Sequence, residues 1–226
     1  MDGSITVFGG TGFIGRHLVP MLVRSGATVR VAVRNRRRVE VTTKSDQEAE
    51  YIQADLLDDV TVGAAIAGTD AVVNLVGILT ETANQTYRAI HVEGARRVAL
   101  AAERHGVMRL IYTSTLGASS ISPAVSDRTM AEGELAVRDV FPQATIVRPS
   151  LVFGEDDHFF SRFAAMIRSS LVLPLIGGGT TKFQPVFVDD MTAGLLDLLE
   201  RPIRPARPYE LGGLRFTASR RSWNSC

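Results

Sequence analysis

Hydrophobic and polar positions along the chain form two alternating kinds of segment. Short, nearly continuous apolar runs predict buried parallel strands, and longer segments with apolar residues three or four positions apart predict helices. The predicted strands are 5–8, 29–33, 51–56, 70–77, 109–115 and 144–149. The predicted helices are a segment that starts at residue 13 and ends at Gly26, followed by 60–67, 85–105 and 127–141. This alternation is typical of an α/β protein with a parallel sheet.

Beyond Pro149 the alternation loosens. The pattern there predicts a helix over 159–167, a turn-rich loop over 173–179, a short strand over 185–188, a helix capped by Asp189 or Asp190 that runs to Glu200, and a proline-punctuated linker over 201–208. We therefore expect a Rossmann-type, doubly wound parallel sheet in residues 1–150. Residues 151–226 should form a small C-terminal lobe that is interleaved with this core as a single structural domain.

The first predicted strand runs directly into a glycine cluster, Gly9-Gly-Thr-Gly-Phe-Ile-Gly15. Gly9 would let the chain turn off the strand, Gly12 would let the backbone approach a pyrophosphate, and Gly15 would let helix and strand pack closely. The N-terminus of the following helix offers unpaired N–H groups and partial positive charge to phosphates. A glycine triplet can also arise without a ligand, but its place at the first strand–helix junction favours a dinucleotide site. We predict that this site includes Gly9, Thr11, Gly12, Phe13, Ile14 and Gly15.

The end of the second strand indicates which nicotinamide nucleotide is bound. An acidic residue near this position would hold the ribose 2′-OH of NAD, whereas here the strand ends in Arg34, followed by Arg36-Arg37-Arg38. Arginine pairs well with a 2′-phosphate, so we expect NADP(H), with NAD(H) as the alternative. A solvated basic loop would explain the same arginines. The ends of the other strands complete the predicted cofactor site with Asp55, Leu56, Leu75, Val76, Gly77, Thr113 and Pro149.

Composition narrows the function classes further. The chain has 226 residues, 45% of them hydrophobic, and a net charge of +1, which disfavours disorder and nucleic acid as a partner. Its single cysteine, Cys226, has no partner for an internal disulfide, which fits a reducing compartment. We expect neither a signal peptide before the first strand nor a transmembrane segment, and therefore a cytoplasmic protein. The four histidines are scattered, so we expect surface or capping roles and no metal site.

Several of these motifs together resemble an extended or atypical short-chain dehydrogenase/reductase, over the chain to about residue 213. They are Gly9–Gly15, Gln53-Ala-Asp-Leu56, Asn74-Leu-Val-Gly77, Tyr112-Thr-Ser-Thr115 and Arg148-Pro-Ser150. Within that superfamily, residues 143–154, 159–163, 177–179, 182–188 and 209–213 are similar to the dinucleotide-binding accessory subunit of respiratory complex I and its bacterial relatives. The resemblance implies a nicotinamide dinucleotide, a protein partner in a respiratory complex or its assembly, and a place at the cytoplasmic face of the inner membrane, or on the matrix side of a mitochondrion.

The resemblance breaks at the catalytic residues. Reductases of this superfamily use a Tyr-x-x-x-Lys pair, in which the lysine lowers the pKa of the tyrosine that exchanges a proton with the substrate. The matching positions here are Ser126 and Met130, and no Tyr-x-x-x-Lys occurs anywhere in the chain. The position of an active-site asparagine is His91, while Ser114 or Thr115 retains a hydroxyl that could orient a carbonyl. We therefore assign no catalytic residue. If the protein is active, the candidates are Ser114, Thr115 and His91.

Three hypotheses follow. The first is a non-catalytic NADP(H)-binding structural or assembly protein. The second is an active NAD(P)-dependent oxidoreductase or sugar-nucleotide epimerase/dehydratase with unusual acid–base residues, such as His91 or Asp127. The third is a redox-sensing regulator that distinguishes oxidised from reduced nucleotide. Relatives continue into further helices after the position of Gly213, whereas residues 216–226 have no apolar periodicity, so we expect a truncated lobe and an open cleft.

Overall fold

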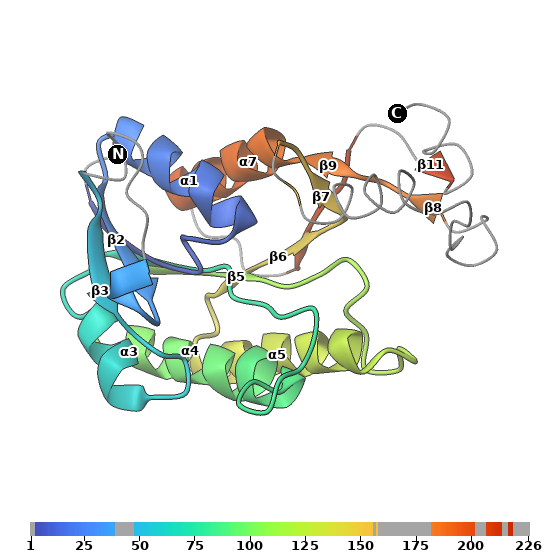
Figure 1. The fold of residues 1–226 in the computed structure, drawn as a ribbon, viewed down its shortest axis with the longest axis horizontal. Coiled ribbons are helices and arrows are strands. Elements are labelled where there is room, and N and C mark those ends of the chain that lie inside the picture. The colour runs from blue at the N-terminus through green and yellow to red at the C-terminus, as the bar shows by residue number, and fades with distance from the viewer. Residues whose placement is uncertain are drawn as a thin grey trace.

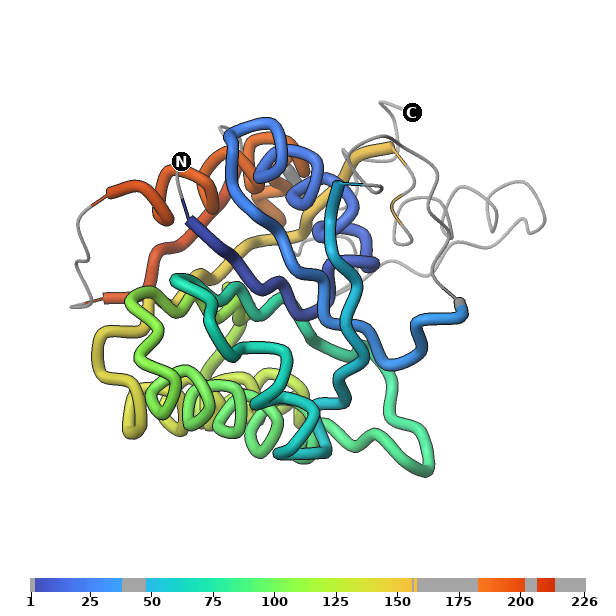
Figure 2. Tube along the Cα trace, turned by 90° about the vertical axis from the view of Figure 1, so that its left-hand side faces the viewer, coloured from blue at the N-terminus to red at the C-terminus, as the bar shows by residue number. Residues whose placement is uncertain are grey.

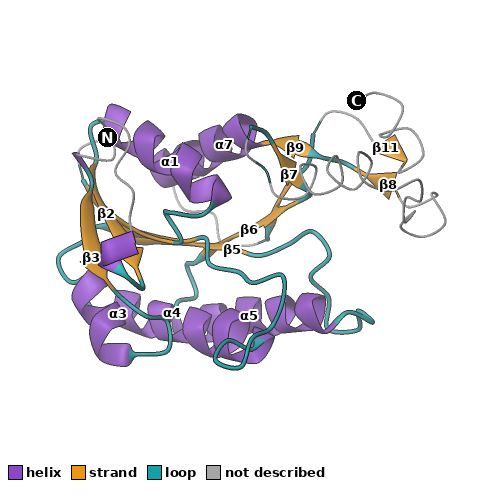
Figure 3. Ribbon diagram, in the orientation of Figure 1, coloured by secondary structure: helices purple, strands orange, loops and turns teal. Residues whose placement is uncertain are grey.

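A central sheet lies between two layers of helices in this computed structural model (Figures 1 and 3), which describes residues 3–38, 48–155, 157, 182–201, 207–213 and 217–218. One face of the sheet is covered by α1 (Phe13–Arg24) and α7 (Val188–Glu200). The opposite face is covered by α3 (Asp59–Ile66), α4 (Ala95–Arg104) and α5 (Val125–Val140). Although α1 and α7 come from opposite ends of the chain, they pack side by side (Figures 1 and 2).

The main sheet has seven strands in the order β10-β6-β5-β4-β1-β2-β3. Their bounds are β1 Ser4–Phe8, β2 Thr28–Val33, β3 Glu50–Gln53, β4 Ala71–Asn74, β5 Arg109–Thr113, β6 Thr145–Pro149 and β10 Tyr209–Leu211. Every neighbouring pair is parallel. The strand order reverses between β1 and β4, which makes this the switch point of a doubly wound sheet. The predicted fold class is confirmed.

The part of the chain beyond residue 150 departs from the prediction in several places. The strand predicted over 185–188 is β9 (Val186–Phe187), and it pairs with β7 (Val152–Phe153) in a separate two-stranded sheet. Three-residue β10 extends the main sheet just after the predicted linker over 201–208, where no strand was predicted. In addition, β8 (Lys182–Phe183) pairs with β11 (Thr217–Ala218). The predicted helix over 159–167, the loop over 173–179 and most of the 216–226 tail lie outside the described residues. The division at residue 150 stays a prediction.

The cap predicted for α7 is wrong. The N-cap residue is Phe187, without a side-chain hydrogen bond to the helix, while Asp189 and Asp190 lie inside the first turn. Carboxylates in that turn still complement the partial positive charge of a helix N-terminus. Aspartates at these two positions therefore indicate that a helix begins nearby, but they do not identify its N-cap residue.

The helix predicted over 85–105 is two elements. A π-helix, η2 (Arg88–Gly94), precedes α4. Gly133 of α5 lies so close to η2 that a Cβ atom there would be 2.0 Å from the backbone oxygen of His91. The extra residue per turn in a π-helix is invisible to a search for 3.6-residue periodicity, and such turns are frequent at functional sites.

Apolar side chains pack into two cores, one on each face of the sheet. The core beneath α3, α4 and α5 includes Phe8, Val72 and Tyr112, and the core beneath α1 and α7 includes Val7, Leu18 and Leu195. Because inner strands such as β1 and β4 are buried on both faces, they read as continuous apolar runs in the sequence. None of the described helices is both long and apolar enough to cross a membrane.

Candidate functional site

The glycine turn after β1 leaves the N-terminus of α1 open. Gly9 has φ of +79°, a left-handed conformation that favours glycine, and its carbonyl accepts a hydrogen bond from the Gly12 N–H at 3.0 Å. Gly12 is the N-cap of α1, yet no side chain caps the helix and its first turn contains no acidic residue. Uncapped N–H groups and partial positive charge therefore face the carboxyl end of the sheet, an arrangement that suits an anion.

Two glycines in this turn allow close backbone packing. A Cβ atom at Gly15 would lie 2.4 Å from both the Gly9 oxygen and the Gly10 Cα, so Gly15 seats the helix against the turn itself. Gly10, which sequence reasoning passed over, packs against β2: a Cβ atom there would lie 2.7 Å from Val31 Cγ1. The adjacent glycines at positions 9 and 10 were the signal that could have identified it.

A cleft of about 270 Å³ opens at the carboxyl ends of β1 to β4, beside the glycine turn. The structure brings together nine of the predicted cofactor residues in its lining: Gly9, Thr11, Gly12, Arg34, Asp55, Leu56, Leu75, Val76 and Gly77. Further lining residues were not predicted, namely Phe8, Ala32, Val33, Ala54, Ile78, Gln85 and Ile90. Phe8 and Val33 are the last residues of their strands, so strand ends alone could have indicated them.

Eight other candidate residues lie outside this lining: five of the predicted cofactor residues and the three catalytic candidates, one of which, His91, lies in η2. Phe13, Ile14 and Gly15 form the first turn of α1, directly behind the glycine turn. Thr113 and Pro149 end β5 and β6, and Ser114 and Thr115 follow β5. The four residues at the ends of β5 and β6 lie at the same carboxyl edge of the sheet as the cleft. In the strand order, β5 and β6 come after β4 on the side away from β1.

Arg34, which follows β2, and Asp55, which follows β3, both line the cleft. The side chain of Arg34 is exposed, and no ion pair joins it to another described residue. Asp55 accepts a hydrogen bond from the Leu57 N–H at 3.0 Å, which fixes the turn after β3. An accessible guanidinium at this position could pair with a phosphate on the ribose.

The loop after β4 forms one wall of the cleft and is held by two buried side chains. Asn74 Oδ1 accepts a hydrogen bond from the Val76 N–H at 3.0 Å, and His91 Nε2 accepts one from the Ile78 N–H at 3.1 Å. His91 is fully buried, at 0% exposure, so the expected surface position is wrong for this residue, while both of its ring nitrogens are capped by hydrogen bonds. Burial is the main cause that lowers the pKa of His91, which favours a neutral ring.

Met130, one of the two residues that replace the catalytic pair, faces this wall. Met130 of α5 packs on the core, and its Cε would lie 3.1 Å from a Cβ atom at Gly77. The nearest phenol to Met130 is buried Tyr112, whose hydroxyl donates to the His91 carbonyl at 3.1 Å. Burial, with a smaller contribution from the charge of Glu134, raises the pKa of Tyr112, which is opposite to what proton transfer near neutral pH needs.

The NAD dependent epimerase/dehydratase family matches this sequence over residues 5–212. The chain belongs to this family.

The curated relatives of this family member include subunits of a mitochondrial NADH dehydrogenase and a reductase. Mitochondrial NADH dehydrogenase [ubiquinone] 1 alpha subcomplex subunit 9 of Arabidopsis thaliana is 38% identical over 214 residues, covering 92% of this chain and 53% of the relative. The mouse (Mus musculus) subunit of the same name is 35% identical, covering 92% and 56%. The ceramide reductase of Caulobacter vibrioides is 30% identical, covering 89% and 62%. The chain thus spans about half the length of the subunit 9 relatives that it matches.

Solved structures share the fold of this family member. DesIV, a dTDP-glucose 4,6-dehydratase from Streptomyces venezuelae with NAD and TYD bound, superposes with a TM-score of 0.81 at 21% identity, covering 98% of this chain and 79% of DesIV. The Bordetella bronchiseptica enzyme WbmG in complex with NAD and UDP superposes with a TM-score of 0.80 at 16% identity, covering 99% and 77%.

Two buried hydroxyls of the epimerase/dehydratase family member have no hydrogen-bond partner among the residues that the structure describes. They are Thr113 Oγ1 and Ser114 Oγ, with residue exposures of 7% and 5%. Buried polar atoms in native proteins are nearly always satisfied, so an orphan pair needs an explanation. Thr113 ends β5 and Ser114 comes directly after it, at the carboxyl edge of the sheet. A polar ligand atom that reaches this end of β5 would supply the missing hydrogen-bond partner.

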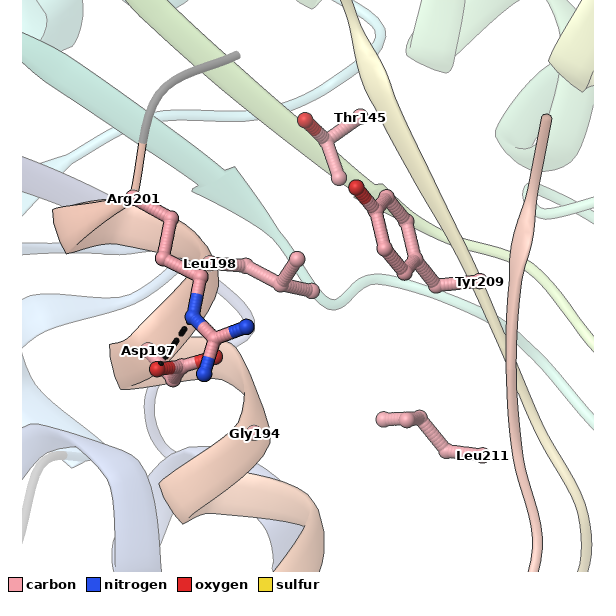
Figure 4. A pocket seen from close by; sticks show the side chains of 7 residues that line it. All are labelled: Thr145, Gly194, Asp197, Leu198, Arg201, Tyr209 and Leu211. Atoms are coloured by element: carbon pink, nitrogen blue, oxygen red, sulfur yellow. Dashed lines mark hydrogen bonds and ion pairs between the residues drawn. The ribbon is translucent and has the colours of Figure 1, made fainter. Parts of the chain in front are cut away.

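A second cavity lies at the opposite edge of the sheet (Figure 4). It has a volume of about 350 Å³ between the C-terminal half of α7 and strands β6 and β10. Figure 4 shows Arg201 and Asp197, joined at 2.7 Å, on one side and Thr145 and Tyr209 on the other. Thr145 begins β6, while Tyr209 and Leu211 are the first and last residues of β10, so this cavity lies along the β6–β10 side of the sheet, away from the glycine turn. None of the predicted cofactor residues lines it.

No group of metal-ligating side chains occurs among the described residues. Asp127, the other acid–base candidate, accepts a hydrogen bond from Ser122 Oγ at 3.0 Å at the start of α5. Its carboxylate also lies against Gly117, where a Cβ atom would be 3.1 Å away. Asp127 thus joins the start of α5 to the loop after β5.

Proposed function

We propose that this epimerase/dehydratase family member binds a nicotinamide dinucleotide in the cleft beside the glycine turn and uses it as a structural cofactor. One observation carries the proposal: an open, uncapped helix N-terminus lies beside a site whose Tyr/Lys pair is replaced by Ser126 and Met130. The nucleotide diphosphate would lie against the turn from Gly9 to Gly12, with N–H groups as donors. When bound, the cofactor would supply hydride chemistry. Met130 carries no charge that could lower the pKa of a phenol for the accompanying proton transfer.

Nucleotide binding should raise the thermal stability of the purified protein. A ligand that binds only the native state stabilises it by about 2.7 kcal/mol at a concentration 100 times its dissociation constant. For a chain of this size that corresponds to a rise in Tm of roughly 5–10 °C. We expect this shift with NADPH in a melting experiment. No shift with any of the four nicotinamide nucleotides would contradict the proposal, and unequal affinities for the oxidised and reduced forms would favour the redox-sensing alternative.

We further propose that NADP(H) is preferred, because Arg34 could pair with the 2′-phosphate. Arg34→Gln should weaken NADPH binding by about 10- to 100-fold, the range expected for a lost charged hydrogen bond, and change NADH binding less than twofold. The matched control is Arg36→Gln, which removes a neighbouring exposed arginine outside the cleft lining. Isothermal titration with both nucleotides would measure the difference. An equal loss for NADPH and NADH, or an equal loss in the control, would contradict the role of Arg34.

The subunit 9 relatives support a place in a respiratory complex I or its assembly, at the cytoplasmic face of the inner membrane or on the matrix side of a mitochondrion. We expect the full chain, tagged in its own cells, to migrate with complex I or one of its assembly intermediates on a native gel of membranes. A strain that lacks the core subunits of complex I is the control. Migration that is identical in the two strains would contradict this part of the proposal.

An active reductase or epimerase is the second candidate, and the orphan hydroxyl of Ser114 together with the reductase relatives favours it. Its acid–base residue would be Asp127, because the ring of His91 is buried and both of its nitrogens are hydrogen-bonded. Substrate-dependent change in nicotinamide absorbance that is lost in Asp127→Asn and Ser114→Ala would support this function over the structural one.

A further inference from the structure

We propose that His91 is a positioning residue whose neutral ring holds the Gly77–Ile78 wall of the cleft, so that nucleotide binds more tightly when this ring is unprotonated. This inference rests on the proposed nucleotide site. It assigns His91 a role that is neither acid–base catalysis nor a surface contact. The ring never touches the nucleotide, because His91 is fully buried.

The hydrogen bonds around the ring determine which nitrogen carries the proton. At one end, the Ile78 N–H can only donate, and it lies 3.1 Å from His91 Nε2, which must therefore accept. At the other end, the Ser126 carbonyl can only accept, and it accepts a hydrogen bond from the Thr129 hydroxyl at 2.9 Å. The Thr129 oxygen is then free to accept from His91 Nδ1–H at 3.0 Å. A neutral ring with its proton on Nδ1 satisfies the whole relay.

A protonated ring cannot make the same contacts. Both of its nitrogens would be donors, so Nε2–H would face the Ile78 N–H and one hydrogen bond of the wall would be lost. Burial lowers the pKa of His91 from its ordinary value of 6.5, while the negative charge of Glu81 opposes that shift. Two tyrosines also lie close to His91: the ring centroid of Tyr87 is 5.4 Å away, and the Tyr112 hydroxyl donates to the His91 carbonyl.

The wall that His91 holds faces both the cleft and α5. Gly77 and Ile78 line the cleft, and Gly77 lies against Met130 of α5. The backbone of His91 is itself fixed in the π-helix by Tyr112 and by the close approach of Gly133. The ring therefore connects a rigid pair of helices to the one wall of the cleft that follows β4. When the wall loses this hydrogen bond, the part of the cleft nearest β5 should widen.

The test compares His91→Gln with the unchanged full chain. A glutamine amide can accept from the Ile78 N–H and donate to Thr129 without titrating near neutral pH. At about pH 8 we expect the two proteins to bind NADH within about twofold of each other. As the pH falls to about 5, the unchanged protein should lose about two- to tenfold in affinity relative to His91→Gln, the range of one net hydrogen bond. His105→Gln is the matched control, because His105 is exposed at the end of α4 and outside the cleft lining.

NADH is the probe because it lacks the 2′-phosphate, whose own titration would overlap with that of a histidine. Equal pH profiles for the unchanged protein and His91→Gln would overturn this inference and leave the nucleotide site intact. No binding of NADH or NADPH at any pH would overturn the proposed function and this inference together.

A measurement without nucleotide tests the relay directly. Nitrogen NMR of the histidine rings should show His91 as the Nδ1–H tautomer, and hydrogen exchange should show a protected Ile78 amide that His91→Leu exposes. A proton on Nε2, or an unprotected Ile78 amide in the unchanged protein, would overturn the inference even if the nucleotide binds.

Discussion

Alanine at position 15 should abolish nucleotide binding and destabilise the protein. Its Cβ atom would lie 2.4 Å from the Gly9 oxygen and the Gly10 Cα, and these backbone atoms cannot rotate away as a flexible side chain could. Overpacking of this kind costs about 3 kcal/mol or more when backbone must shift. The turn would open and misdirect the N–H groups of α1, so we expect NADPH affinity to fall by about 100-fold or more, as several charge-assisted hydrogen bonds are lost.

Two further glycine-to-alanine variants separate loss of the site from loss of the fold. Gly12 has φ of −78°, and a Cβ atom there would lie 3.2 Å from the Gly9 oxygen. Gly12→Ala should therefore melt close to the unchanged protein without nucleotide, yet lose the thermal shift with NADPH because its methyl group enters the cleft. Gly63→Ala on α3 meets only the end of the His105 side chain at 3.6 Å and should gain about 0.5–1 kcal/mol of stability. A Gly15→Ala variant that binds NADPH normally would contradict the assigned site.

The second large effect concerns stability alone. Arg148 of β6 donates two hydrogen bonds to Glu134 of α5, at 2.8 and 2.7 Å, and the Glu134 side chain is only 7% exposed. The hydrogen bond to Glu134 is the main cause that raises the pKa of Arg148, so the guanidinium stays charged. Glu134→Gln would leave this partly buried positive charge with only the 4.0 Å contact to Glu210, whose side chain is 61% exposed. We expect a loss of about 3 kcal/mol in the free energy of unfolding, measured by chemical denaturation.

Glu50→Gln is the matched control for this prediction. Glu50 accepts from Arg30 at 3.1 Å, but its side chain is 58% exposed, and Arg30 has other partners in the carbonyls of Ala65 and Ala67. An exposed ion pair of this kind contributes up to about 1 kcal/mol. Equal losses in the two variants would show that burial does not strengthen the Glu134–Arg148 pair.

The parts of the fold that the sequence predicts are those with a strong local pattern. Continuous apolar runs identify inner strands such as β1 and β4, which are buried on both faces, whereas edge strand β3 has no fully buried residue. The glycine turn is recognisable because its backbone requirements select glycine. The ends of those runs also place Arg34, Asp55 and Gly77 at one edge of a parallel sheet, where the structure joins them in one cleft. Local chemistry thus predicts the nucleotide-binding half of the site.

The other features depend on contacts between distant segments. β10 has three residues, too few for a period, and it joins the sheet only because β6 offers an edge. His91 is a polar residue inside an apolar core, and nothing in its neighbours along the chain indicates the relay from Ile78 to Thr129. The π-helix follows from the close approach of Gly133, which lies 42 residues beyond His91 and cannot be read from either segment alone.

All described residues that line the cleft beside the glycine turn lie between Phe8 and Ile90. A ribosome therefore completes this lining before it makes α5, β6 or β10. A dinucleotide that meets the growing polypeptide could clamp β1 to β4 while the later strands are still being synthesised. Cellular nucleotide supply would then influence how much of this protein matures, in addition to how stable the finished molecule is.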